Sequence, residues 1–105
     1  MSENLTLCRV EAAPRTVLHD KLALTGCEVS VNELPAGAAV PFVHRHQENE
    51  ELYGVLAGKG ELYLDGEVHE IAAGDWFKVK PEGHRAIRAS AESALKFICI
   101  QTKAG

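Results

Sequence analysis

The chain has 105 residues, of which 46% are apolar, so length and composition predict one domain with one hydrophobic core. Its 11 basic and 15 acidic residues give a formal net charge of −4, which is opposite to the basic surface typical of nucleic-acid binding. No window approaches the roughly 18 apolar residues of a membrane span, and the first residues do not resemble a secretory signal. We therefore expect a cytoplasmic protein with neither nucleic-acid nor membrane partners.

The cysteines argue against a disulfide framework or a thiolate zinc site. Cys8, Cys27 and Cys99 are odd in number, widely spaced and outside any CxxC pair. We expect them to be small buried hydrophobic residues.

Turn residues recur along the chain at intervals typical of an all-β sandwich or barrel. The segments between them have strand chemistry, in chain order CEVSVNEL (27–34), ELYGVLAG (51–58), GELYLDG (60–66), EVHEIAAG (67–74), DWFKVKP (75–81), HRAIRA (84–89) and ALKFICIQT (94–102). The pair Asp65-Gly66 between two alternating runs predicts a tight hairpin. No segment carries a sustained helical stripe.

The stretch PFVHRHQENEELYGVLAGKG (41–60) is the first candidate for chemistry. His44 and His46 are two residues apart and would share one face of a strand. A four-residue loop at QENE would fold the chain back, with Glu51 opposite His46 and Tyr53 opposite His44. Two imidazoles and one carboxylate on one face form an open site for non-haem Fe(II), with Mn, Ni or Zn as alternatives. The competing interpretation is a charged surface hairpin, because an HxH triplet alone is a weak motif.

These residues resemble the cupin superfamily, in particular its small single-domain members of the cupin 2 conserved-barrel type. The first cupin motif, G-x5-HxH-x3,4-E-x6-G, is matched by His44, His46, Glu51 and Gly58, with Gly37 one residue too far upstream. The second motif is matched through Gly74, Asp75, Pro81 and Gly83. The resemblance implies a jelly-roll β-barrel (a double-stranded β-helix) over about residues 35–102 of a single domain, 1–105.

The second motif departs from the family at the histidine that completes the metal site. Counted from Pro81 this position is Ala86, and counted from Gly74 without gaps it is Arg85. His84 follows Gly83 directly and on a regular strand shares a face with Ala86, so His84 is the candidate fourth ligand. The alternative is a polar residue at the mouth of the barrel.

Two further residues are candidates for contact with a substrate. Tyr53 is expected to hydrogen-bond a substrate or an imidazole ligand, unless it only fills the barrel. Arg88 shares the parity of His84 and would pair with an anionic substrate through its fork of donors, unless it is a surface residue.

The resemblance leaves the function open between classes. With a divalent metal bound, the protein would be an oxygenase or isomerase of a small molecule, in which the ion acts as Lewis acid or activates O2. The alternative is a non-catalytic cupin that binds a small ligand such as a sugar or an organic acid, and a metal-free scaffold is a third class. The likeness to small cupins also implies a homodimer, for which the apolar run Phe97 to Ile100 offers a surface.

Overall fold

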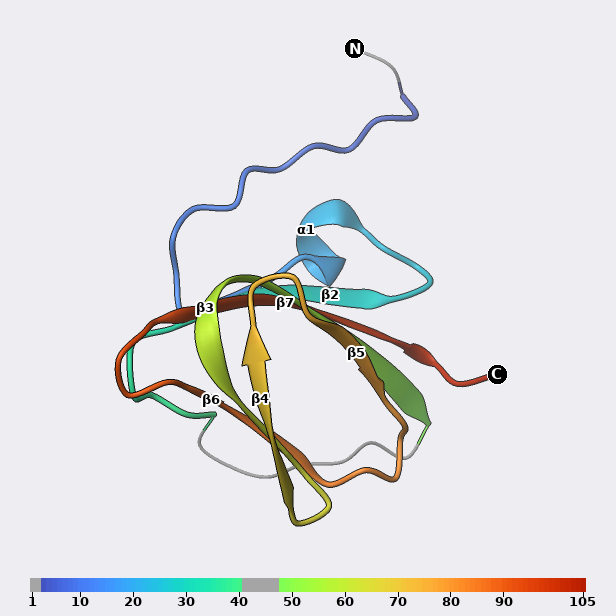
Figure 1. The fold of residues 1–105 in the computed structure, drawn as a ribbon. Helices are drawn as coiled ribbons and strands as arrows, with labels where there is room; N and C mark the ends of the chain where they lie inside the picture. The colour runs from blue at the N-terminus through green and yellow to red at the C-terminus, as the bar shows by residue number, and fades with distance from the viewer. Residues whose placement is uncertain (1–2, 41–47) are drawn as a thin grey trace.

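The structure, a computed structural model, describes residues 3–40 and 48–105. It consists of β1 (Arg15–Val17), α1 (His19–Leu22), β2 (Glu28–Leu34), β3 (Asn49–Leu64), β4 (Glu67–Ala72), β5 (Trp76–Val79), β6 (Arg85–Ala89) and β7 (Leu95–Lys103) (Figure 1). All strand pairs are antiparallel. The predicted all-β jelly-roll barrel is confirmed.

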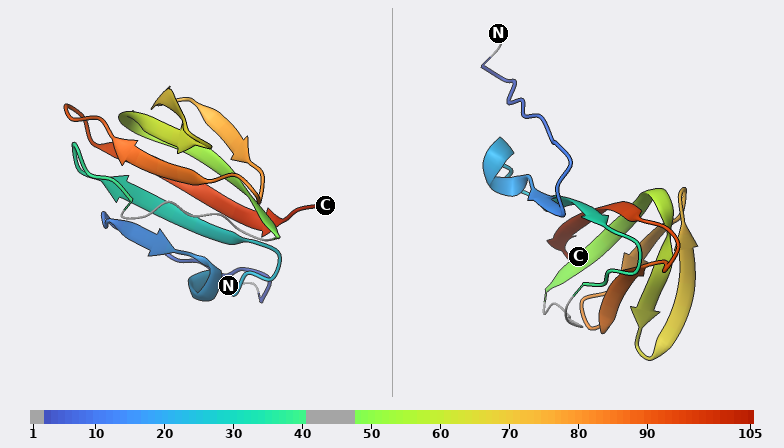
Figure 2. Two further views of the ribbon diagram at one scale, coloured as in Figure 1. Left: turned by 90° about the horizontal axis from the view of Figure 1, so that it is seen from below. Right: turned by 90° about the vertical axis from the view of Figure 1, so that its left-hand side faces the viewer.

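Strand β3 organises the barrel because it belongs to two sheets in turn. Its first half lies between β7 and β5, and its second half lies between β4 and β6. The first sheet therefore has the order β1-β2-β7-β3-β5, and the second sheet is β4-β3-β6. The right-hand view of Figure 2 shows these sheets closing around a common interior.

The break expected between the segments 51–58 and 60–66 is wrong, since the chain continues there as one 16-residue strand. A register shift between Val55 and Ala57 bends β3, as a β-bulge does, without reversing the chain. Gly58 follows the bulge with a φ of 85°. A Cβ atom at Gly58 would lie 1.8 Å from the carbonyl oxygen of Ala94, so the close approach to the neighbouring chain requires glycine.

The predicted hairpin at Asp65-Gly66 is confirmed. Both residues have positive φ, 49° and 86°, as a two-residue hairpin turn of the I′ type requires. The flanking residues Leu64 and Glu67 are the first pair of the β3–β4 ladder.

The hydrophobic core fills the space between the sheets. Alternate residues of β7 point into it, because Leu95, Phe97 and Cys99 are buried while Ile98 and Ile100 are half-buried on the outer face. The other core members are Tyr53, Val55, Leu62, Ile71, Val79, Ile87 and Ala89. The rings of Tyr53 and Phe77 stack with centroids 4.9 Å apart.

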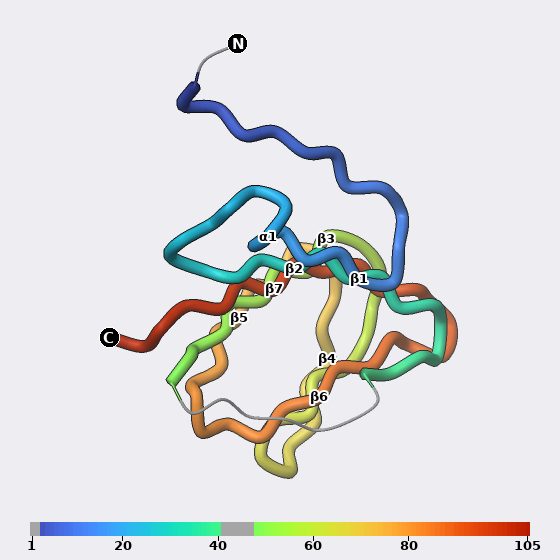
Figure 3. The backbone as a smooth tube through the Cα atoms, turned by 180° about the vertical axis from the view of Figure 1, so that it is seen from behind, coloured from blue at the N-terminus to red at the C-terminus, as the bar shows by residue number. Residues whose placement is uncertain are grey.

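The chain before β1 runs away from the barrel. Residues 3–14 leave the ring of strands as an extended segment without a strand or helix (Figure 3). We call residues 3–14 the N-terminal arm. No helix in the described part of the chain is long and apolar enough to cross a membrane.

Candidate functional site

The register of the first sheet brings polar residues together on its inner face. Cross-strand partners share a face, so each ladder row can be read as a set of neighbours. One row runs Ser30, Cys99, Tyr53, Phe77, and the next runs Glu28, Gln101, Glu51, Val79. Within these rows Glu51 is 1% exposed and therefore lies inside the barrel.

Several donors surround the carboxylate of Glu51. Its Oε1 atom accepts hydrogen bonds from the Tyr53 hydroxyl at 2.5 Å and from Arg85 Nη1 at 2.7 Å. Its Oε2 atom accepts from the Cys99 thiol at 3.4 Å. A buried charge needs such partners, because an isolated carboxylate in the core would cost several kcal/mol.

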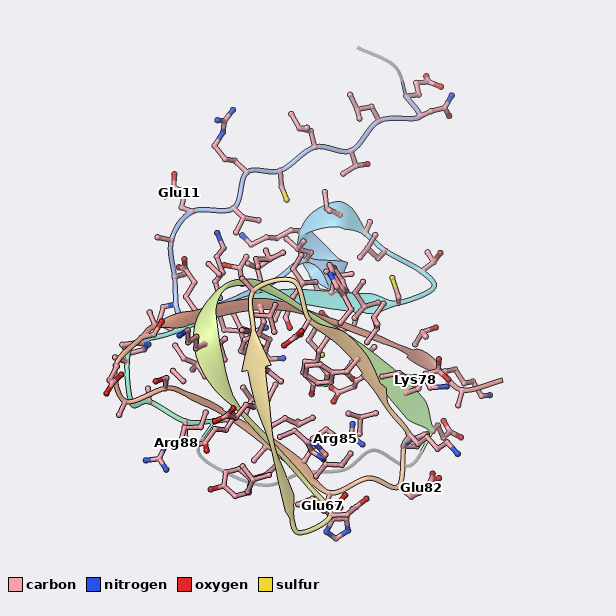
Figure 4. The ribbon with its side chains drawn as sticks, in the orientation of Figure 1. Glu11, Glu67, Lys78, Glu82, Arg85 and Arg88 are labelled. Carbon is pink, nitrogen blue, oxygen red and sulfur yellow. The ribbon has the colours of Figure 1, made fainter. Side chains whose placement is uncertain are left out.

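Arg85 supplies the opposite charge from the second sheet and is itself 0% exposed. Its Nε and Nη2 atoms both donate to the carbonyl oxygen of Gly83, and Nη2 also donates to the carbonyl oxygens of Lys80 and Pro81. Carbonyl oxygens of the turn before β6 therefore bind Nε and Nη2 of the guanidinium, and Nη1 points toward Glu51. Figure 4 shows Arg85 inside the barrel and Arg88 outside it.

The two neutral donors beside Glu51 stay protonated at neutral pH. Burial, and then the charge of Glu51, raises the pKa of the Cys99 thiol to about 12. Burial is also the main cause that raises the pKa of Tyr53, with the Cys99 and Glu51 charges adding to it. Neither group is therefore an anion that could act as a base or nucleophile near neutrality.

These groups line a cavity of about 80 Å³ inside the barrel. Its described lining contains three charged residues, Arg15, Glu51 and Arg85. The remaining described lining residues are Ser30, Asn32, Val40, Tyr53, Ala86, Ile87, Phe97, Cys99 and Gln101. The charges on this lining sum to one positive charge.

The structure brings together only some of the predicted site residues. Glu51 and Tyr53 meet in the interior, whereas His44 and His46 lie outside the described residues. The two ladder positions beside Glu51 belong to Val79 and Gln101, so the predicted hairpin register, which set His46 there, is wrong. Strand β3 is paired on both sides at this point and has no edge left for a hairpin partner.

His84 and Arg88 share a face of the chain, as their parity predicted, but this face lies on the outside of the barrel instead of the inside. Both side chains are exposed, and His84 instead uses its backbone N–H to donate to Asp65 Oδ1 at 2.8 Å. The inward positions of β6 are Arg85, Ile87 and Ala89. The structure therefore does not bring His84 or Arg88 to Glu51.

Sequence reasoning missed Arg85 as an interior residue. A signal was present, because the ungapped count from Gly74 placed the family's metal-binding histidine at position 85. The structure turns this position inward, and the guanidinium of Arg85 lies beside Glu51 there.

The described residues do not fit a metal ion. Among residues 3–40 and 48–105, no group of three or more His, Cys, Asp or Glu side chains is arranged to hold one. An ion on Glu51 would share the carboxylate with the Arg85 guanidinium, and two cations so close together repel each other. Among the described residues, the cation paired with Glu51 is the guanidinium of Arg85.

Comparison with known proteins agrees with this architecture. The family model of the cupin domain (Cupin_2) matches residues 30–101. A crystal structure of a cupin protein from Bacteroides fragilis is similar with a TM-score of 0.93 and 53% sequence identity, covering 100% of this chain and 88% of that chain. An uncharacterized protein of Methanocaldococcus jannaschii is 31% identical over 87 residues, which are 81% of this chain and 68% of the relative.

A more distant likeness shows the fold alone. A crystal structure of a sugar phosphate isomerase from Silicibacter pomeroyi has a TM-score of 0.75 at 22% identity, and the match covers 87% of this chain and 60% of that chain.

Proposed function

This chain belongs to the cupin family, and from the charges that line its barrel we propose that it binds a small organic acid in the cavity beside Glu51 and Arg85. The observation that carries the proposal is the buried Arg85, which lies where the count from Gly74 placed the family's metal-binding histidine. A fixed guanidinium recognises carboxylates by directed hydrogen bonds, as a metal ion recognises them by coordination.

Arg85 retains one donor for a ligand. A guanidinium has five N–H groups, of which Nε, both groups on Nη2 and one group on Nη1 have acceptors. The second N–H on Nη1 has no acceptor among residues 3–40 and 48–105. A ligand carboxylate in the cavity would satisfy this donor.

Arg15 adds the second positive charge. It lies on the edge strand β1, where its partner Asn32 also lines the cavity, and its own side chain is exposed. Arg15 makes no ion pair within the described part of the chain. Since Glu51 balances only one of the two arginines, a ligand with one negative charge would neutralise the lining.

The protonation states of the groups inside the barrel agree with binding of a ligand without catalysis. Cys99 and Tyr53 both keep their protons at neutral pH, and the Glu51 carboxylate is engaged by Arg85. A general acid or base works best when its pKa lies near the working pH. We therefore assign the described groups to recognition of the ligand.

The second candidate is a divalent ion, Fe, Mn, Ni or Zn, held by His44, His46 and Glu51. The HxH spacing and the interior position of Glu51 favour it. Such an ion would supply Lewis-acid chemistry or O2 activation to an oxygenase or isomerase. The contact between Arg85 and Glu51 is the observation against it.

The test uses lactate and pyruvate as probes, with lactamide as the uncharged counterpart of lactate. Calorimetric titration of the full chain, purified without a histidine tag and dialysed against EDTA, should show saturable binding of at least one acid and none of lactamide. Arg15→Gln should weaken that binding about ten-fold or more, the loss expected for one charge-assisted contact, whereas Arg88→Gln outside the barrel should leave it unchanged. The proposal would be refuted if neither acid binds, or if Arg15→Gln binds the acid with the same affinity as the wild type.

The same preparation separates the two candidates. Elemental analysis before the EDTA step should find far less than one divalent ion per chain if Arg85 is the cation of the site. A stoichiometric ion that disappears in His46→Ala would favour the metal-dependent candidate instead.

A further inference from the structure

A carboxylate oxygen at the edge of the cavity is buried without a partner. Glu28 is the first residue of β2, and the register sets it opposite Gln101, in the same inner row as Glu51. The Oε1 atom of Glu28 is buried, and the described residues offer it no hydrogen-bond donor. Buried polar atoms are rarely left unpaired, because each one loses its bonds to water without replacement. Glu28 is therefore a candidate for contact with a bound molecule.

Two neighbours of Glu28 place it beside the cavity. Its cross-strand partner Gln101 lines the cavity, and so does Ser30, the next residue of β2 on the inner face. Adjacent strands lie ~4.8 Å apart, so roughly 10 Å separates the backbones of Glu28 and Glu51 on either side of β7. The guanidinium of Arg85 contacts Glu51. A negative group and a positive group therefore lie apart from each other along one interior.

Glu28 remains open to a ligand, whereas Glu51 is already engaged. Both oxygen atoms of Glu51 accept hydrogen bonds from the side chains described above. The nearby imidazole of His19 bonds through Nδ1 to Asp20 at 2.9 Å. That bond is the main cause of the raised pKa of His19, to which the charge of Glu28 adds from a distance. A ligand that carries a positive donor would give the buried oxygen of Glu28 its missing partner.

We propose that the ligand of the cavity is a small amino acid, whose carboxylate binds to the arginines and whose ammonium group binds to Glu28. With Glu28 counted beside Arg15, Glu51 and Arg85, two positive and two negative charges sum to zero, which suits a zwitterion. An ammonium group has three donors and forms charge-assisted hydrogen bonds with a carboxylate. This inference rests on the proposed function, because the arginines hold the ligand's carboxylate in both.

Glu28 would then determine which acids the cavity accepts. An acid without an ammonium group leaves the buried oxygen of Glu28 unpaired, and a site that is built to bond a polar group discriminates against ligands that lack this group. A second carboxylate on the ligand would be repelled by Glu28. The cavity should therefore prefer an amino acid to the same acid without its ammonium group.

Calorimetric titration of the full chain with matched pairs of acids tests this preference. The amino acids are L-alanine, β-alanine and γ-aminobutyrate, in which the distance from the ammonium group to the carboxylate increases. The counterparts without an ammonium group are propionate for the first two and butyrate for the third. At least one amino acid should bind about ten-fold or more tightly than its counterpart, the gain expected for one charge-assisted contact.

The decisive variant is Glu28→Gln, which keeps the shape of the side chain and removes its charge. It should lower the ratio of the two affinities about ten-fold or more, a readout that a general loss of structure would not produce because both ligands would be affected alike. The matched control is Glu33→Gln on the same strand. Glu33 lies in the alternate register and pairs with Lys96 at 3.9 Å, so its substitution should leave the ratio unchanged. Circular dichroism establishes that each variant is folded.

The outcomes separate this inference from the proposed function. If lactate, pyruvate or propionate binds but no amino acid is preferred to its counterpart, the inference is overturned and the proposed function stands. The inference is also overturned if Glu28→Gln keeps the wild-type ratio or weakens both ligands equally. If no acid of either kind binds, both the inference and the proposed function fail.

Discussion

The pair formed by Glu51 and Arg85 gives the most direct prediction for stability. Arg85→Met keeps a long side chain in the barrel but removes its charge and every donor. Glu51→Gln keeps the shape of the other partner and removes its charge. In either variant one buried charge loses the opposite charge that lies 2.7 Å away.

The magnitude follows from the burial of both partners. Breaking a buried ion pair from one side costs about 3–5 kcal/mol, because the remaining charge is left uncompensated. Arg85→Met should fall at the upper end, since it also removes the side-chain donor to the carbonyl oxygens of Gly83 and Pro81. For a domain of this size each kcal/mol lowers the melting temperature by about 4–8 °C, so we expect a decrease of roughly 12 °C or more.

The double variant Glu51→Gln/Arg85→Met tests the coupling. With both charges absent it should be more stable than the sum of the single effects predicts, by about 2–3 kcal/mol. Urea unfolding is best followed by far-UV circular dichroism, because Trp76 is 55% exposed already in the folded protein. Protein concentration is held equal across variants so that association contributes equally. Single variants within about 1 kcal/mol of the wild type, or strictly additive effects, would refute the reasoning.

Two further predictions concern the thiol and the bent strand. Burial and the charge of Glu51 raise the pKa of Cys99 from 9.0 to about 12. Between these pH values the unfolded chain therefore binds fewer protons than the folded protein. The free energy of unfolding should then decrease as pH rises through this range. The decrease is at most about 1.4 kcal/mol per pH unit for this thiol and should be shallower in Cys99→Ala; equal slopes in urea titrations would contradict it. Gly58→Ala should prevent folding or strongly destabilise the fold, since its Cβ atom would lie 1.8 Å from the Ala94 carbonyl oxygen. The control Gly66→Ala has a φ of 86° but nothing within 4 Å of its Cβ atom. It should lower the free energy of unfolding by only about 1–2 kcal/mol. Similar melting temperatures for these two alanine variants would show that the contact at Gly58 does not matter.

The sequence predicted those parts of the fold whose causes are local. The hairpin at Asp65-Gly66 was predictable because two adjacent residues with positive φ need such a pair. The continuation of β3 through Gly58 was not predictable, because a glycine with positive φ serves a bulge as well as a turn.

The candidate site depended on contacts between distant parts of the chain. The segment HRAIRA has apolar residues on both faces, so its pattern does not decide which arginine points inward. Arg85 is held inside by Glu51, 34 residues earlier, and by the carbonyl oxygens of the preceding turn. Buried arginine is rare, so a reader of the sequence places it outside until its partners are known.

The central position of β7 in the first sheet affects the order in which the chain can fold during synthesis. Strand β7 is translated after β2 and β3, yet it lies between them and pairs with both. Until residues 95–103 emerge, β2 has no partner in the sheet except the three-residue strand β1. The hairpin of β3 and β4 and the added strand β6 involve shorter loops and can form first. A nascent chain that stalls before residue 95 would therefore present an unpaired strand edge to chaperones or to other chains.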